Sequence, residues 1–281
     1  MKIKKAIITS AGASQHTIPL QSFVDRDGIQ KTALRILIEE VLSGGVDEII
    51  IVVMPGDQDA YKIAAGDLAE SLHFVEQREP LGYGHALACA RKFVGDDPFL
   101  HLVSDHLAIS GTQKRCAQQL VEIASVENCS VSAVQPTHES MLPSFGAIGG
   151  QRVPKKSDLY VIENVLEKPT PTEAEQFLTV AGLRAGYYLC FFGMHVLTPL
   201  VMELLDEMNS NGSKSEKIHL SPALAKLARR EKFLAFQVQG RRYDMGGKYG
   251  LLFAQLALAL DGEEKDEVLA HMVELLASRK I

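Results

Sequence analysis

Residues 10–14 could bind an anion. They read Ser-Ala-Gly-Ala-Ser and follow Ala6, Ile7 and Ile8, a short apolar run typical of a central strand buried on both faces. Small residues after such a strand let backbone N–H groups approach a phosphate. A tight strand-to-loop turn without a ligand is the alternative, because the sequence contains neither GxGxxG nor GxxxxGK[ST].

Asp105 could contact a metal or a ligand. It directly follows the run Phe-Leu-His-Leu-Val-Ser at 99–104, which predicts a strand. In an open α/β sheet, a carboxylate at the C-terminal tip of a central strand faces the ligand crevice. An N-cap or turn aspartate remains the alternative interpretation of Asp105.

The elements that would position these residues alternate between strands and helices. Up to residue 135 the sequence predicts strands at 6–8, 48–54, 73–75, 99–104 and 129–135, with helices at 31–42, 58–70, 82–93 and 113–124. This alternation indicates an α/β fold with a Rossmann-like, mostly parallel sheet flanked by helices. Strand-like pieces at 145–149, 159–166 and 186–196 then indicate a smaller β-rich portion beside the crevice.

The end of the chain is predicted to be mainly helical. We expect helices at 199–208, 221–230, 248–260 and 265–279, a strand at 233–238, and a turn at 241–247. The two last helices carry many large apolar residues, which could pack on the domain or form the interface of a homo-oligomer. Packing on the domain is the simpler expectation.

Composition excludes several classes of protein. The net charge of -6 over 281 residues argues against a nucleic-acid-binding protein. The four cysteines contain no CxxC pair, so a zinc site is not expected and reduced, buried cysteines are. No segment approaches the ~20 apolar residues of a membrane span. We therefore expect a cytoplasmic enzyme or binding protein.

Six stretches, in order along the chain, resemble the sugar-nucleotide pyrophosphorylases, and most closely the UTP:glucose-1-phosphate uridylyltransferases. The similarity runs from about Lys5 to Leu258. Its motifs are the loop from Ala11 and Gly12 to Pro19, the segment Gln77-x4-Gly82-x-Gly84-His85-Ala86, Asp105 after its strand, Gly146 followed by Glu167-Lys168-Pro169, the weaker Glu216 to Leu224, and Asp244-x-Gly246-x-Lys248.

The resemblance implies one GT-A-like nucleotidyltransferase domain over residues 1–281. Residues 1–140 would form the nucleotide-binding half, 141–250 the sugar-binding half and 251–281 the C-terminal helices. The implied reaction is attack of a hexose 1-phosphate, expected to be glucose 1-phosphate, on the α-phosphorus of a nucleoside triphosphate, expected to be UTP, with release of pyrophosphate. The implied ligands are nucleotides and sugar phosphates.

The resemblance also implies the site residues. Asp105 and Asp244 would hold Mg²⁺, and Lys168 would join them as a catalytic residue that meets the sugar phosphate. The substrate-binding residues would be Ala11, Gly12, Ala13, Gln77, Gly82, Gly146, Glu167, Lys168 and Gly186. Two alternatives stay open: Gln77 as a surface residue after a strand, and Glu167 with Lys168 as an exposed ion pair.

The phosphate loop departs from the family pattern, which implies Gly-x-Gly-Thr-Arg and a later lysine. Here Ser14, Gln15 and His16 replace the second glycine, the threonine and the arginine, and the lysine after Pro19 is absent. Loss of one such cation typically costs on the order of 10²–10³-fold in rate. Compensating cations could be His16, Arg26, Lys31 or Arg78.

Two functional hypotheses follow from this departure. The first is an active nucleotidyltransferase with a rebuilt phosphate loop. The second is a catalytically impaired homologue that binds a sugar nucleotide or sugar phosphate as a sensor or partner subunit.

Overall fold

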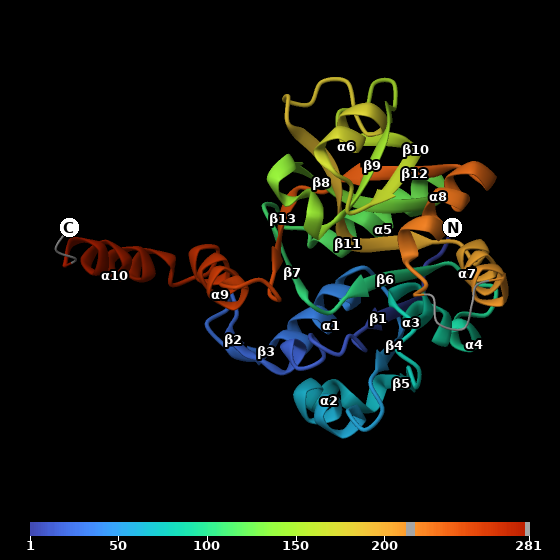
Figure 1. Cartoon of the computed structure of the whole chain (residues 1–281). Helices are drawn as coiled ribbons and strands as arrows, with labels where there is room; N and C mark the ends of the chain where they lie inside the picture. Colours follow the sequence, from blue (N-terminus) through green and yellow to red (C-terminus); the bar gives the residue numbers. More distant parts are fainter. Residues whose placement is uncertain (212–216, 279–281) are drawn as a thin grey trace.

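A nine-stranded mixed sheet forms the centre of the molecule, with strand order β5-β4-β1-β6-β11-β8-β12-β10-β9 (Figure 1). The computed structural model describes residues 1–211 and 217–278. The mixed α/β class expected from the sequence is confirmed. Helices cover both faces of the sheet, and α10 projects away from it at the C-terminal end.

Parallel pairing is concentrated in the first half of the sheet. There β1 lies between β4 and β6, and β5 pairs with β4, all in parallel. The four strands are β1 (Lys5–Thr9), β4 (Glu48–Val53), β5 (Leu72–Glu76) and β6 (Phe99–Val103). They are connected through α1 (Ala33–Ser43), α2 (Gln58–Ala65), α3 (Tyr83–Cys89) and the short α4 (Arg91–Val94).

The second half of the sheet is largely antiparallel and corresponds to the β-rich portion expected from the sequence. Its long strand β11 runs antiparallel to β6, β8 and β9, and a register shift between Phe191 and His195 marks a bulge in it. The strands are β8 (Ser130–His138), β9 (Gly146–Arg152), β10 (Leu159–Glu167), β11 (Tyr187–Leu197) and β12 (Phe233–Gln237). Four helices accompany them: α5 (Cys116–Glu127), α6 (Pro171–Phe177), α7 (Leu200–Asn211) and α8 (Leu220–Arg230).

Alternating side chains of β1 enter two different cores, as a central strand buried on both faces requires. Ala6 and Ile8 pack in the cluster that contains α1, α2 and α5, whereas Ile7 packs in the cluster that contains α3, α7 and α8. Thr32 caps α1 by accepting a hydrogen bond from the Arg35 amide at 3.1 Å. The strand predicted at 6–8 is therefore confirmed as a central one.

Two small antiparallel pairings lie outside the main sheet. One joins β2 (Ser22–Val24) to β3 (Gln30–Thr32), and the other joins β7 (His106–Ser110) to β13 (Gly240–Asp244). The prediction of a turn at 241–247 is therefore wrong for residues 241–244, which belong to strand β13. The sequence signal failed because a five-residue strand with polar ends has no clear alternation, and its partner is distant in sequence.

The two C-terminal helices differ in their contact with the domain. α9 (Gly250–Leu260) buries Gly250, Ala254 and Leu258, whereas α10 (Lys265–Ala277) buries no residue. The expectation that both helices pack on the domain is thus wrong for α10, and the predicted end at 279 lies outside the described residues. Over the described ranges, no helix combines the length and apolar character needed to cross a membrane.

The four cysteines are free, and three of them are buried.

A pair of histidines is buried in the centre of the sheet. His101 of β6 and His195 of β11 are register partners whose rings stack with centroids 5.8 Å apart. Thr9 hydrogen-bonds His101 at 3.1 Å, and Ser132 hydrogen-bonds His195 at 2.6 Å. Burial lowers the pKa of His101 well below its usual value and that of His195 to about 3.

We expect this histidine pair to make the protein sensitive to acid. The unfolded chain takes up protons on histidine below pH ~6.5, whereas the folded chain keeps both rings neutral, so the free energy of unfolding falls with pH by about 1.4 kcal/mol per pH unit for each histidine. Urea unfolding between pH 7.5 and 4.5 measures this slope. His195→Gln should make the slope shallower and exposed His138→Gln should not; equal slopes in all three proteins would contradict the assignment.

Candidate functional site

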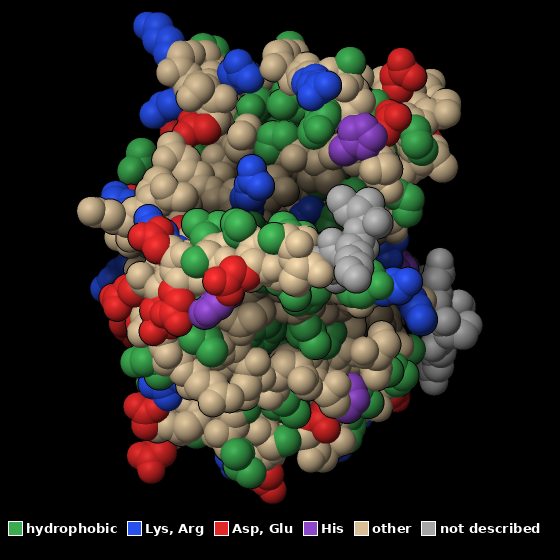
Figure 2. Space-filling model, turned by 90° about the vertical axis from the view of Figure 1, so that its left-hand side faces the viewer, with side chains coloured by type: hydrophobic (Ala, Val, Ile, Leu, Met, Phe, Trp, Pro, Cys, Tyr) green, Lys and Arg blue, Asp and Glu red, His purple; other side chains and the backbone are tan. Residues whose placement is uncertain are grey.

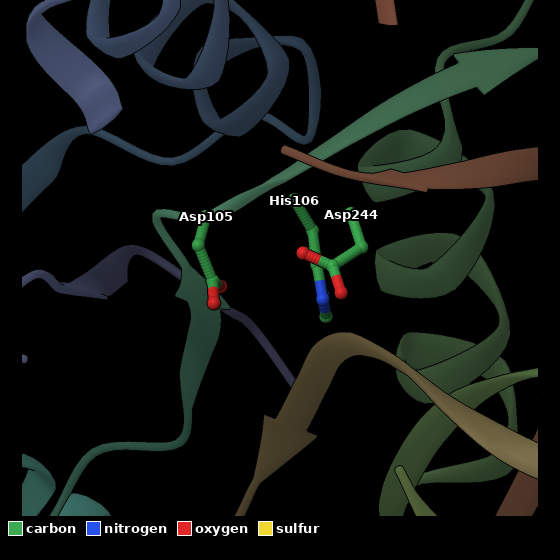
Figure 3. A group of neighbouring side chains, drawn as sticks. All are labelled: Asp105, His106 and Asp244. Atoms are coloured by element: carbon green, nitrogen blue, oxygen red, sulfur yellow. The ribbon is translucent and has the colours of Figure 1, made fainter. Parts of the chain in front are cut away.

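A pairing of two short strands brings Asp105 and Asp244 together. Asp105 lies in the turn between β6 and β7, and Asp244 ends β13, where it is the register partner of His106. The Met245 amide donates a hydrogen bond to the Asp105 carbonyl at 2.8 Å. One ligand atom from each of Asp105, His106 and Asp244 lies within 4.8 Å of the others (Figure 3). The expected proximity of the two aspartates is found.

The two carboxylates lie close together without a neutralising partner. Within the described parts of the chain, neither forms an ion pair with a lysine or an arginine. Burial raises the pKa of Asp105, although a backbone hydrogen bond and the charge of Arg242 act in the opposite direction. Among the described residues, the Asp244 carboxylate accepts one hydrogen bond, from the Gly246 amide at 2.9 Å. Such an arrangement favours a bound cation, which would satisfy both groups.

His106 and Arg242 complete the surroundings of the acidic pair, and sequence reasoning missed both. The Arg242 guanidinium lies 3.5 Å from the centroid of the Phe145 ring and donates to the Phe191 carbonyl. Burial lowers the pKa of Arg242 to about 10, and burial together with Arg242 lowers the pKa of His106 to about 4. The imidazole is therefore neutral at pH 7 while the guanidinium stays charged. In the sequence, these two residues could have been suspected only from their positions, because His106 follows Asp105 and Arg242 lies two residues before Asp244.

The loop after β1 presents backbone donors near this centre. The amides of Gln15 and His16 both donate to the Gly12 carbonyl at 2.9 Å. Over the described residues, no acceptor binds the amides from Ala11 to Ser14, so these donors are available to an anion. Tyr61 of α2 supports the loop by donating to the His16 carbonyl at 2.5 Å.

The loop also touches the turn that carries Asp244. A Cβ placed on Gly246 would lie 3.0 Å from Nε2 of the Gln15 side chain. Gln15 therefore stands against the acidic centre at a position where, by resemblance, the family has a threonine.

None of the cations considered as replacements is available at the loop. His16 is held by Asp57 at 2.7 Å, and the Lys31 ammonium contacts three carboxylates at 2.7–3.0 Å. Arg26 pairs with Asp261 at 3.2 Å, and Arg78 is exposed beside Glu76. The compensation considered from the sequence is therefore not formed in this structure.

Gln77 and Gly82 are in direct contact at the expected base-binding segment. The Gln77 side chain is 6 % exposed, and its amide nitrogen lies 3.0 Å from both the Gly82 carbonyl and His85 Nδ1. The alternative of a surface residue is therefore wrong. Gly82 has φ +103°, and a Cβ there would lie 2.7 Å from the Ile218 carbonyl oxygen. The glycine is thus required by the protein's own backbone, whatever ligand approaches.

Gly146 and Glu167 face each other as register partners of β9 and β10. Ser221 of α8 donates a hydrogen bond to Glu167, and a Cβ on Gly146 would lie 2.8 Å from the Ser221 hydroxyl. The charges of Asp105 and Glu167 both raise the pKa of Tyr83, secondary to its burial. Both carboxylates therefore lie close enough to Tyr83 for their charges to act on its hydroxyl.

Lys168 and Gly186 are the two remaining residues of the expected substrate site. Lys168 is exposed with φ +47°, and within the described ranges it forms no ion pair, so the alternative of a pair with Glu167 is not realised. Gly186 precedes β11, whose Leu189 pairs with Ile148 two residues beyond Gly146. The Gly186 carbonyl accepts a hydrogen bond from the Glu139 amide at 2.9 Å. Its place in the substrate site stays a prediction.

We expect Gly82→Ala to destabilise the fold and to distort the base segment. A positive φ costs a non-glycine residue about 1–3 kcal/mol, and the Ile218 backbone leaves no room for the new Cβ. Gly95→Ala is the matched control, because Gly95 has φ +61° but no atom within 4 Å of its added Cβ. Urea unfolding should show that Gly82→Ala lowers the free energy of unfolding by at least about 1 kcal/mol more than Gly95→Ala does. Equal decreases in the two variants would show that the Ile218 backbone moves to accommodate the new Cβ.

Relatives of known activity match this chain over nearly its whole length. The UTP–glucose-1-phosphate uridylyltransferase YngB of Bacillus subtilis is 26% identical over 303 aligned positions, which cover 98% of this chain and 96% of YngB. The UTP–glucose-1-phosphate uridylyltransferase of Streptococcus pneumoniae is also 26% identical, with the same coverage of 98% and 96%.

Solved structures show the same fold. A UDP-glucose pyrophosphorylase complexed with UDP-glucose superposes with a TM-score of 0.76 at 23% identity, covering 91% of this chain and 98% of that protein. The structure of the UTP-bound UGPase of Acinetobacter baumannii superposes with a TM-score of 0.74 at 23% identity, covering 98% of this chain and 100% of that protein. Residues 5–259 match the family profile described as nucleotidyl transferase. From this match, which spans both the acidic centre and the loop beside it, the chain belongs to the nucleotidyl transferase family.

Proposed function

We propose that this protein joins UTP and glucose 1-phosphate to give UDP-glucose and pyrophosphate, with Mg²⁺ held by Asp105 and Asp244. The observation that carries the proposal is the pair of un-neutralised carboxylates at the edge of the sheet, beside the free amides of residues 11–14. The relatives at 26% identity support the choice of UTP and glucose 1-phosphate.

The donor set fits a divalent ion. Asp105 is half-buried, its carboxylate forms no ion pair with a described lysine or arginine, and the Asp244 carboxylate lies beside it. Two carboxylate oxygens with water and phosphate oxygens are the usual environment of Mg²⁺. When bound, such an ion neutralises charge on the transferring phosphoryl group and orients its oxygens.

The chain's own residues would hold the two substrates in line. The amides of residues 11–14 would bind triphosphate oxygens, and Gln77 would read the edge of the uracil ring. Glu167, already oriented by Ser221, would accept hydrogen bonds from sugar hydroxyls. Lys168 lies next to Glu167, is exposed and is free of a described carboxylate, so its ammonium is available to the sugar phosphate. Phosphoryl transfer depends on this positioning more than on covalent help from the protein.

One observation favours a second candidate function. The loop provides amide donors but no cation, because His16 is paired with Asp57 and Lys31 is enclosed by carboxylates. Charge that develops on the leaving pyrophosphate would then be poorly stabilised. A protein that binds UDP-glucose as a sensor or partner subunit, with little or no turnover, would retain the base and sugar contacts and lack this clamp.

Release of pyrophosphate from UTP, glucose 1-phosphate and MgCl₂ tests the first function. We expect turnover that falls at least about 10²-fold in Asp105→Asn and in Asp244→Asn, because each change removes an anionic ligand of the Mg²⁺ that would neutralise the transferring phosphoryl group. Asp47→Asn, at a surface pair with Lys4, is the control and should keep full activity. No turnover combined with a higher melting temperature in UDP-glucose would establish the second function; absence of both signals would refute both.

We also propose that a second copy of this chain covers α9 and α10. α9 is apolar around most of its circumference, as normally buried helices are. α9, α10 and the residue before α9 nevertheless expose nine large side chains: Tyr249, Leu251, Leu252, Phe253, Leu260, Leu269, Val273, Leu275 and Leu276. Hydrophobic side chains gather across the middle of the face toward which α10 points (Figure 2). Their combined exposed area is on the order of the ~800 Å² that each partner buries in a standard interface.

Light scattering after size-exclusion chromatography measures this assembly. We expect the full chain to elute as a dimer and the variant Leu269→Asp/Val273→Asp to elute as a monomer of unchanged melting temperature, because α10 contributes no buried side chain to the domain. Ile63→Asp, at an exposed apolar position of α2, should remain dimeric. A monomeric wild-type chain would refute the proposal.

A further inference from the structure

His106 is placed in the acidic centre by the same strand pairing that places Asp244. It follows Asp105 directly and is the register partner of Asp244 across β7 and β13. One of its ring nitrogens lies within 4.8 Å of an oxygen of each carboxylate. Figure 3 shows the imidazole beside the Asp244 carboxylate and pointing in the same direction.

The His106 ring packs against Phe145, with ring centroids 6.0 Å apart, but this contact leaves one of its nitrogens without a partner. Its Nδ1 is buried and, over the described residues, has no hydrogen-bond partner. A buried nitrogen without a partner costs about 1–3 kcal/mol, and such groups in native structures call for an explanation, of which an absent ion is one.

The fold makes room for this ring. Gly193 lies in the bulge of β11 with φ +88°, and a Cβ there would lie 2.7 Å from His106 Nδ1. A side chain at position 193 would therefore push the imidazole out of its place. The bulge and its glycine keep His106 at the acidic centre, as bulges near functional sites often redirect a side chain.

The donor set of the centre is thus two carboxylate oxygens and one neutral imidazole nitrogen. Mg²⁺ favours oxygen ligands in an octahedral arrangement. Imidazole raises affinity for the later first-row ions, which follow the order Mn²⁺ < Fe²⁺ < Co²⁺. The three ligand atoms already lie within 4.8 Å of one another, so one ion could contact all three.

We propose that His106 is a third protein ligand of the metal centre and makes it prefer Mn²⁺ to Mg²⁺. This inference rests on the metal site of the proposed function and adds to it the basis of metal selectivity. Mg²⁺ still binds through the two aspartates, but the nitrogen ligand contributes mainly to the affinity for Mn²⁺.

Pulsed electron paramagnetic resonance of the Mn²⁺-loaded protein, with and without UTP, tests the ligand directly. We expect ¹⁴N coupling typical of a coordinated imidazole in the wild type, loss of this coupling in His106→Asn, and its retention in His271→Asn on exposed α10. Equilibrium binding should show the Mn²⁺ affinity of His106→Asn reduced about 10-fold or more, with the Mg²⁺ affinity changed by less than about 3-fold.

The outcomes separate the two proposals. Mn²⁺ binding that is lost in Asp105→Asn but shows no ¹⁴N coupling in the wild type would overturn the role of His106 and leave the metal site in place. Absence of Mn²⁺ binding to the wild type, alone and with UTP, would overturn both. If His106→Asn does not fold, the ¹⁴N spectrum of the wild type still decides, because imidazole coupling either is present or is not.

Discussion

The short antiparallel pairing of β7 with β13 is the interaction on which the acidic centre depends. It joins two segments far apart in the sequence and puts Asp244 opposite His106. The hydrogen bond from the Met245 amide to the Asp105 carbonyl extends this contact by one further step. The same segment continues into α9, so the strand pairing also determines where the C-terminal helices leave the domain.

The electrostatics of the site are unequal on its two sides. At the acidic centre, two carboxylates meet without an ion-pair partner among the described residues, and the nearby Arg242 is held against Phe145 and the Phe191 carbonyl. At the loop, free amides are present, but neighbouring carboxylates hold the positive side chains. A cation with an anionic ligand would satisfy both sides together. This complementarity supports a phosphate-containing substrate, and the missing loop cation is the reason that binding and turnover have to be considered separately.

Glycine positions in this site are explained by the protein's own packing. A Cβ added at Gly82 would meet the backbone of Ile218, one at Gly146 would meet the side chains of Ser221 and Phe191, and one at Gly193 would meet the His106 ring. Two of these approaches, at Gly82 and Gly193, join the first half of the chain to the second. The site is therefore built by close contacts that a side chain at any of these three positions would disturb.

The sequence by itself determined the α/β class, the central position of β1 and the nucleotidyltransferase resemblance, because apolar runs and motif order are local properties of a chain. It also indicated that Asp105 stands at the tip of its strand. The tertiary structure alone decided that 240–244 is a strand, that His106 and Arg242 lie at the acidic centre and that α10 buries no residue against the domain. These features depend on register and burial between distant segments, and no local pattern in the sequence encodes which distant residues will meet.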